Sequence, residues 1–133
     1  MKLKRVRSCN YYHQTNRWNA QSIIQNGFYV DSGGNQRFTE GVYLLNHPDG
    51  SYGETTLKVC VDGDFLDFTN DYMGDDWVAF KRKYWKGNYT DLTTDIRNEY
   101  PRADGIAFET MLVVWKPEKI RKVEVKKMEV KYK

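Results

Sequence analysis

The order of the secondary-structure signals predicts an α+β fold, a sandwich of strands with flanking helices. Strand-like alternation of apolar and polar residues occurs towards both ends of the chain, whereas helix-like patterns lie between them. The 133 residues are the length of one domain, and no repeat, linker or low-complexity stretch divides them. We therefore expect a single α+β domain over residues 1–133.

The first part of the chain predicts a strand, a helix and a second strand. Val6–Tyr12 alternates between apolar and polar residues, as a half-buried strand does. A helix over 16–26 can be capped by Thr15 or Asn16, and Gly27 ends it. A strand at Gly41–Leu45 follows a glycine-rich turn. The apolar stripe of the helix would consist of Trp18, Ala20, Ile23 and Ile24.

The second part of the chain predicts two strands, two helices and three more strands. The first two strands, Leu57–Val61 and Phe65–Phe68, flank Asp62-Gly63-Asp64, a sequence typical of a turn. Helices are expected to begin at Asp75 and at Thr90, the second ending before Pro101. The later strands are Ile106–Phe108, Met111–Trp115 and Arg121–Val130.

Charge is distributed unevenly along the chain. The first seven residues and the last eighteen are basic, whereas the body between them is acidic. Basic ends could attract nucleic acid or an acidic protein partner. Alternatively, Val123, Val125 and Val130 face inward and the lysines between them protect an edge strand from aggregation.

The two cysteines and the hydropathy pattern point to a soluble intracellular protein. Cys9 and Cys60 lie in strand-like segments where buried thiols pack well, and their spacing matches no metal site. No apolar run approaches the roughly 20 residues of a membrane span. Residues 1–7 lack the apolar core of a signal peptide. We expect a cytoplasmic monomer without metal or membrane.

Two residues stand out as candidates for a site. His13 and Tyr43 each lie at the end of a strand-like run, with the predicted helix between them. An imidazole and a phenol ring could therefore converge on one cleft, which suits a nucleotide better than a core.

The motifs around these residues resemble those of ADP-ribosyltransferases of the diphtheria-toxin and PARP type. In that family a His-Gly-Thr strand end precedes a helix ending in Ile-x-x-x-Gly-Phe, and Gly-[Ile/Val]-Tyr follows. This chain has His13-Gln14-Thr15, then Ile23 to Phe28, then Gly41-Val42-Tyr43. A later stretch, from Asp104-Gly105-Ile106 to Ile120, is similar to the late strand of the same family. The resemblance spans roughly residues 10–125 and implies an ADP-ribosyltransferase-like split β-sandwich.

The resemblance implies NAD+ as substrate and assigns a role to each matching residue. His13 would hydrogen-bond the ribose on the adenosine side, and the backbone of Gln14 would hold the nicotinamide carboxamide. Thr15 would steady the strand end, and Tyr43 would stack on the nicotinamide ring. Because nicotinamide leaves readily, the protein must chiefly bind a strained dinucleotide and stabilise the developing cation.

The chain departs from the family pattern at two positions. The family's catalytic glutamate aligns with Met111, which would then line the NAD+ site. Glu109, two residues upstream, could replace the acid through a shift of strand register. Gln14 stands where the family has glycine. Relatives with an apolar residue in place of the acid transfer a single ADP-ribose or are inactive, so polymer synthesis is disfavoured.

Three functions remain open on this basis. The first is an NAD+-dependent mono-ADP-ribosyltransferase that modifies a protein or nucleic-acid acceptor. The second is a catalytically silent module that binds NAD+, ADP-ribose or a partner protein. The third is an RNA 2′-phosphotransferase. Each site residue also has a structural alternative: His13 as a hydrogen-bonded strand end, Tyr43 as core and Glu109 as a surface carboxylate.

Overall fold

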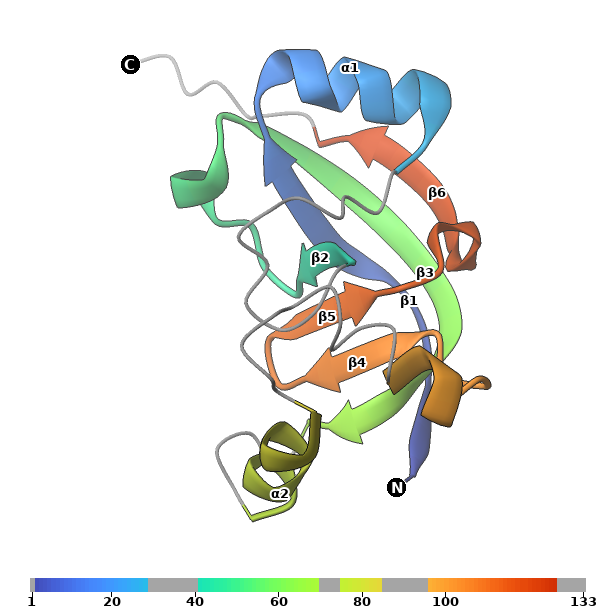
Figure 1. The fold of residues 1–133 in the computed structure, drawn as a ribbon. Helices are drawn as coiled ribbons and strands as arrows, with labels where there is room; N and C mark the ends of the chain where they lie inside the picture. The colour runs from blue at the N-terminus through green and yellow to red at the C-terminus, as the bar shows by residue number, and fades with distance from the viewer. Residues whose placement is uncertain (1, 29–40, 70–74, 85–95, 127–133) are drawn as a thin grey trace.

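The chain folds into a small closed β-barrel, in the computed structural model that describes residues 2–28, 41–69, 75–84 and 96–126 (Figure 1). The sheet has the order β1-β2-β5-β4-β3-β6, and a further pairing of β1 with β3 closes five of its six strands into a ring. Two labelled helices and two short 3-10 turns accompany the strands, and residues 96–99 are also helical. The labelled elements are β1 (Leu3–Thr15), α1 (Arg17–Asn26), β2 (Val42–Leu45), η1 (Gly50–Tyr52), β3 (Thr55–Phe68), α2 (Asp75–Tyr84), β4 (Gly105–Phe108), β5 (Met111–Val114), η2 (Pro117–Lys119) and β6 (Ile120–Val125).

The predicted α+β split sandwich is therefore wrong, because the protein is mostly β and its strands close on one another. The two long strands are responsible. β3 has 14 residues, enough to pair with β1 along one edge and with both β6 and β4 along the other. Its last residues run parallel to β4, with Leu66 opposite Ile106. Because β3 pairs with β1 on one edge and with β4 and β6 on the other, the strands close into a barrel and do not form two separate sheets.

The turn predicted at Asp62-Gly63-Asp64 does not form, and β3 continues through it. The two carboxylates point outward to Arg5 on β1, with an Arg5 Nη2 to Asp62 Oδ1 distance of 2.7 Å. Gly63 leaves space on the inner face, where a Cβ would lie 2.8 Å from Asp104 Oδ2. Residues that favour a turn locally are thus accommodated in a strand by partners far away in the sequence.

The barrel interior is an aliphatic core to which nearly every strand contributes. Its fully buried members include Leu44, Leu57, Val59, Phe65 and Leu112. Helix α1 packs on this core through Ala20 and Ile23. These residues form the inner cluster, whose other members are Val6, Val42, Val61, Ala107 and Val114, with Tyr11, Phe28, Ile120 and Val123 packed against it.

The predicted caps of α1 are confirmed, but its predicted apolar stripe is only partly buried. The Asn16 side chain accepts a hydrogen bond from the Asn19 N–H at 2.8 Å, and Gly27 follows the last turn. Trp18 is 72% exposed and Ile24 is 44% exposed. The helix therefore packs on the barrel with a narrow face, through Ala20 and Ile23.

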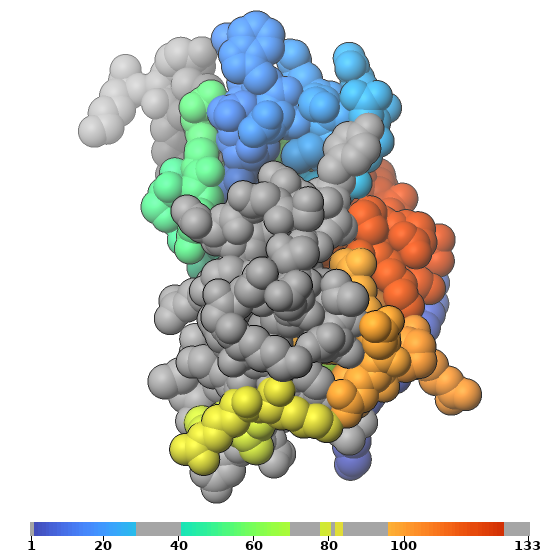
Figure 2. Space-filling view, viewed as in Figure 1, coloured from blue at the N-terminus to red at the C-terminus, as the bar shows by residue number. Residues whose placement is uncertain are grey.

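A second core lies on the outer face of β4 and β5. Its members include Phe68, Ile106, Val113 and Trp115, and it is covered by Phe80 of α2 together with Ile96 and Ala103. We call this the outer cluster; Leu66 and Phe108 also belong to it. Helices α1 and α2 accordingly lie at opposite ends of the molecule (Figure 2).

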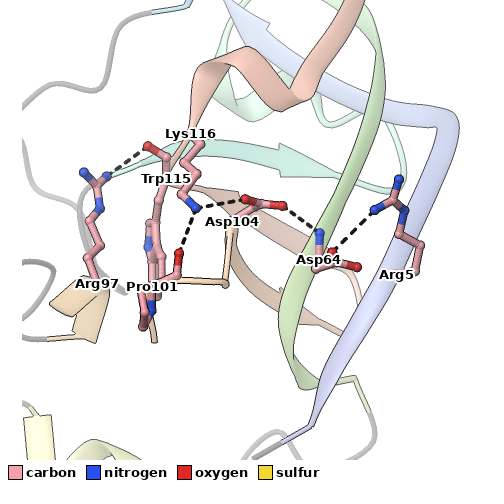
Figure 3. Close-up of polar contacts among 7 residues, drawn as sticks. All are labelled: Arg5, Asp64, Arg97, Pro101, Asp104, Trp115 and Lys116. Atoms are coloured by element: carbon pink, nitrogen blue, oxygen red, sulfur yellow. Dashed lines mark hydrogen bonds and ion pairs between the residues drawn. The ribbon is translucent and has the colours of Figure 1, made fainter. Parts of the chain in front are cut away.

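Asp104 links three segments of the barrel (Figure 3). Its carboxylate accepts a hydrogen bond from the Asp64 N–H at 2.8 Å and lies 3.2 Å from Lys116 Nζ. Its backbone N–H donates to Asp64 O, and its carbonyl accepts from the Trp115 N–H. The side chain is buried, so these bonds connect β3, β4 and the end of β5 in a largely dry environment.

The two buried thiols expected at Cys9 and Cys60 are not present, because these residues form a disulfide.

The strands predicted near 42–45, 106–108 and 111–115 are confirmed. The helix predicted to begin at Thr90 is described only from residue 96, and residues 96–99 are helical; its residues 90–95 lie outside the described residues. Residues 127–130 of the predicted last strand also lie outside them. Within the described part of the chain, no helix has the length and apolarity needed to cross a membrane.

Candidate functional site

His13 lies near the end of β1 with its ring on the inner side of the barrel. Its neighbour across the ladder is Leu57, which is fully buried, and residues opposite one another share a face. The ring also meets Phe28 edge to face, with 5.1 Å between centroids. The imidazole therefore lies among apolar side chains next to the inner cluster.

The Tyr43 backbone orients the His13 ring. His13 Nδ1 lies 2.9 Å from the Tyr43 carbonyl oxygen, an atom that can only accept a hydrogen bond. Nδ1 must therefore carry a hydrogen, and in the neutral ring Nε2 is left as an acceptor.

Burial lowers the pKa of His13 below its ordinary value of 6.5, and the hydrogen bond to Tyr43 opposes this only partly. The ring is consequently neutral at pH 7. A neutral imidazole with Nε2 as acceptor can bind a hydroxyl or an amide N–H of a ligand.

The ring of Tyr43 does not share the side of the sheet on which His13 lies. Val42 and Leu44 belong to the inner cluster, and Tyr43 between them packs against the outer cluster. The structure thus brings the His13 ring together with the backbone of Tyr43, while the His13 and Tyr43 rings lie on opposite faces of the sheet. The two side chains were expected to converge on one cleft; they do not, and only the backbone carbonyl of Tyr43 meets the His13 ring.

The end of β1 is held by the segment after η1. Gln14 Nε2 donates to the Gly53 carbonyl at 2.9 Å, and Gln14 Oε1 is buried with no hydrogen-bond partner among the described residues. Thr15 is buried against Gly53, where an added Cβ would lie 2.5 Å from the Thr15 carbonyl. Glycine is therefore required at position 53.

Glu109 and Met111 lie at the β4–β5 turn. Glu109 is exposed, and its carbonyl accepts a hydrogen bond from Asn46 Nδ2 at 3.2 Å. Met111 begins β5 opposite Leu45 and is half-buried against the outer cluster. The ladders on both sides of β5 run without a shift of register, so no bulge carries Glu109 into the strand.

Phe28, Asn46 and Gly53 shape this region and received no role from the sequence. Phe28 is part of the Gly-Phe motif, but only the fold places its ring on His13. Asn46 joins the turn of β4 and β5 to the end of β2, since its N–H also donates to Thr110 O at 3.0 Å. The described residues contain no cluster of three or more His, Cys, Asp or Glu that could hold a metal ion.

No model of a known protein family, no curated protein and no solved structure matches this chain.

Proposed function

We propose that the barrel binds NAD+ at His13 and transfers a single ADP-ribose to a protein or nucleic-acid acceptor. The observation that carries the proposal is the neutral, half-buried His13, whose Nδ1 is engaged by the Tyr43 carbonyl and whose Nε2 is an acceptor. A ribose hydroxyl is a suitable donor to that atom. The proposal rests on this site and on the motif order, and not on the fold, since one fold supports many activities.

The surrounding groups suggest how the dinucleotide would be held. The backbone of Gln14, which the motif assigns to the nicotinamide carboxamide, follows His13 directly near the end of β1. Thr15, packed on Gly53, would keep this strand end rigid. Rigid donors and acceptors favour a strained bound conformation, from which nicotinamide leaves.

A silent binding module is the second candidate, and the position of the acid favours it. Glu109 is exposed in a turn, and Met111 presents an apolar side chain to the outer cluster. Without a carboxylate near the developing cation, binding would occur without turnover. Stacking of Tyr43 on nicotinamide would require its ring to leave the outer cluster, so Tyr43 contributes to this site chiefly through its carbonyl.

The acceptor, the location and the oligomeric state belong to the same proposal. Basic ends suit an acidic protein or a nucleic acid, which includes the RNA phosphate of a 2′-phosphotransferase. We propose a monomer that works in the cytoplasm. In that compartment thiols are kept reduced, so the Cys9–Cys60 bond would form there only transiently.

Calorimetric titration with NAD+ and ADP-ribose tests binding. His13→Asn keeps an N–H close to the position of Nδ1 and removes the acceptor, and His47→Ala changes an exposed histidine of the β2–η1 loop as a matched control. We expect about tenfold weaker binding for H13N, the value of one hydrogen bond of about 1.4 kcal/mol, and no change for H47A. Absence of binding by the wild type at millimolar ligand would refute the proposal.

A measurement of NAD+ turnover distinguishes the transferase from the silent binding module. The protein is incubated with labelled NAD+ and with fractionated lysate proteins or RNA, and both free nicotinamide and label transfer are scored. Transfer that is lost in H13N indicates the transferase. Binding without nicotinamide release, unchanged by Glu109→Gln, indicates the silent module.

A further inference from the structure

The Cys9–Cys60 disulfide lies where two strand ladders are interrupted. It joins the neighbouring strands β1 and β3. The register of β1 on β3 shifts between Ser8 and Tyr11, and the register of β3 on β6 shifts between Cys60 and Val61. Bulges therefore flank the bond on both sides, which locally disrupts the backbone hydrogen bonds around it.

The two cysteines differ in accessibility. Cys9 is exposed at the bulge of β1, whereas Cys60 is only partly exposed. Cys60 lies on the outward face of β3, because Val59 and Val61 on either side of it are buried in the barrel. An approaching thiol therefore meets Cys9 first.

The charges facing Cys60 favour a thiolate at this position. Lys122 lies directly across the ladder on β6, and Lys58 shares the outward face of β3. A neighbouring ammonium group stabilises a thiolate and makes it a better leaving group.

Acidic groups are also present on this face, and each lies beside basic side chains. Asp62 pairs with Arg5 at 2.7 Å and has Arg7 opposite it. Glu124 lies 3.8 Å from Lys122 Nζ and is opposite Lys58 across the ladder. The residual charge around Cys60 is consequently positive.

We propose that the Cys9–Cys60 bond is a site of reversible thiol exchange in the folded barrel, at which a small thiol or a dithiol attacks Cys9 and Cys60 leaves. This site is separate from the His13 site and does not depend on NAD+ binding.

Exchange with a dithiol proceeds in two balanced steps. A thiolate of the reductant attacks Cys9 Sγ, the Cys9–Cys60 bond breaks, and Cys60 departs as a thiolate. The second thiol of the reductant, after losing its proton, then attacks its own sulfur in the mixed disulfide and releases Cys9. Two electrons pass from the reductant, which becomes a disulfide, and its two protons go to the two cysteines.

The fold should persist when the bond opens. β1 pairs with β3 on both sides of the bulge, from Leu3 to Ser8 and from Tyr11 to Thr15. The inner cluster is formed by other residues and keeps the strands together. Exchange can therefore occur without global unfolding.

The experiment treats the oxidised full-length protein with excess dithiothreitol or with glutathione, without denaturant, and then with iodoacetamide. Mass spectrometry counts alkylated cysteines and locates glutathione, and far-UV circular dichroism follows the fold. We expect two alkylated cysteines with an unchanged spectrum after dithiothreitol. After glutathione we expect the adduct on Cys9 at least about tenfold more often than on Cys60.

Charge variants test the role of the basic face. Lys122→Glu should slow reduction several-fold, whereas Lys119→Glu, the same charge change in η2, should leave the rate unaltered. Reduction that requires urea, glutathione found equally on both cysteines, or equal rates for the two charge variants would overturn the proposal. So would two free thiols that persist after treatment with an oxidant.

Discussion

The buried carboxylate of Asp104 gives the sharpest test of how this barrel is held together. Replacing Asp104 by alanine removes the acceptor of the Asp64 N–H, a bond of 2.8 Å, and the partner of Lys116 Nζ at 3.2 Å (Figure 3). The side chain of Asp104 is 5% exposed, so the Asp64 N–H has little access to water as a substitute. Lys116 is 34% exposed and can turn to solvent.

The magnitude follows from these two losses. A buried donor left without an acceptor costs about 1–3 kcal/mol. An ion pair whose ammonium group reaches water contributes about 1 kcal/mol or less. We therefore expect Asp104→Ala to lower the free energy of unfolding by about 2–4 kcal/mol, a large part of the roughly 5–15 kcal/mol of a typical domain.

Asp104→Asn separates the two contributions. The amide oxygen can still accept from the Asp64 N–H, whereas the amide NH2 takes the place of the oxygen beside Lys116 Nζ, which then turns to solvent; the expected cost is about 1 kcal/mol. Asp64→Ala is the matched control, because it removes an exposed carboxylate but keeps the backbone N–H. Its ion pair with Arg5, at 3.4 Å, is worth less than about 1 kcal/mol.

The assay is urea unfolding followed by circular dichroism and tryptophan fluorescence at pH 7. With a slope of about 2 kcal/mol per molar urea, the alanine variant should unfold at a midpoint lower by about 1–2 M. A loss below about 0.5 kcal/mol, or equal losses for the alanine and asparagine variants, would show that Asp104 is not the link between β3 and β5 that we describe.

Three further predictions concern His13 and the backbone. Because burial lowers the pKa of His13, the unfolded chain takes up this proton at a higher pH than the folded protein does. The free energy of unfolding should therefore keep its full His13 contribution above pH 6.5 and decrease as the pH falls below 6.5. H13N should reduce this pH dependence in urea titrations. Gly105→Ala should abolish folding in circular dichroism, because the new Cβ would overlap the Val113 carbonyl oxygen, whereas Gly50→Ala meets nothing within 4 Å and should be neutral. The double change Cys9→Ser/Cys60→Ser opens a loop of sequence separation 51, and its unfolding free energy should be about 4 kcal/mol below that of the oxidised wild type; equality of the two would contradict the disulfide.

Predictions that depend on neighbouring residues agree with the structure. Asn16 caps α1 and Gly27 ends it, because both signals act within one turn of helix. The short strands near 42–45 and 111–114 were predicted from apolar runs and are present. His13 does lie close to the end of a strand, as the pattern of 6–13 indicates.

Predictions that depend on distant partners failed where the partner decided the outcome. Asp62-Gly63-Asp64 favours a turn by itself, and Arg5 and Asp104 hold it in a strand. Cys9 and Cys60 carry no local mark of pairing, and only the register of β1 on β3 brings them together.

The amino-acid sequence alone located the helix over 16–26 and the short strands near 42–45 and 111–114, and it singled out His13 and Tyr43, whose ring nitrogen and carbonyl meet. The tertiary structure decided that the strands close into a barrel, that the two rings lie on opposite faces of the sheet, and that the Tyr43 carbonyl sets the tautomer of His13. Capping and alternation are short-range effects that a few residues specify. Closure, side-chain facing and hydrogen-bond partners arise from contacts between strands far apart in the chain, so they exist only once the barrel has formed.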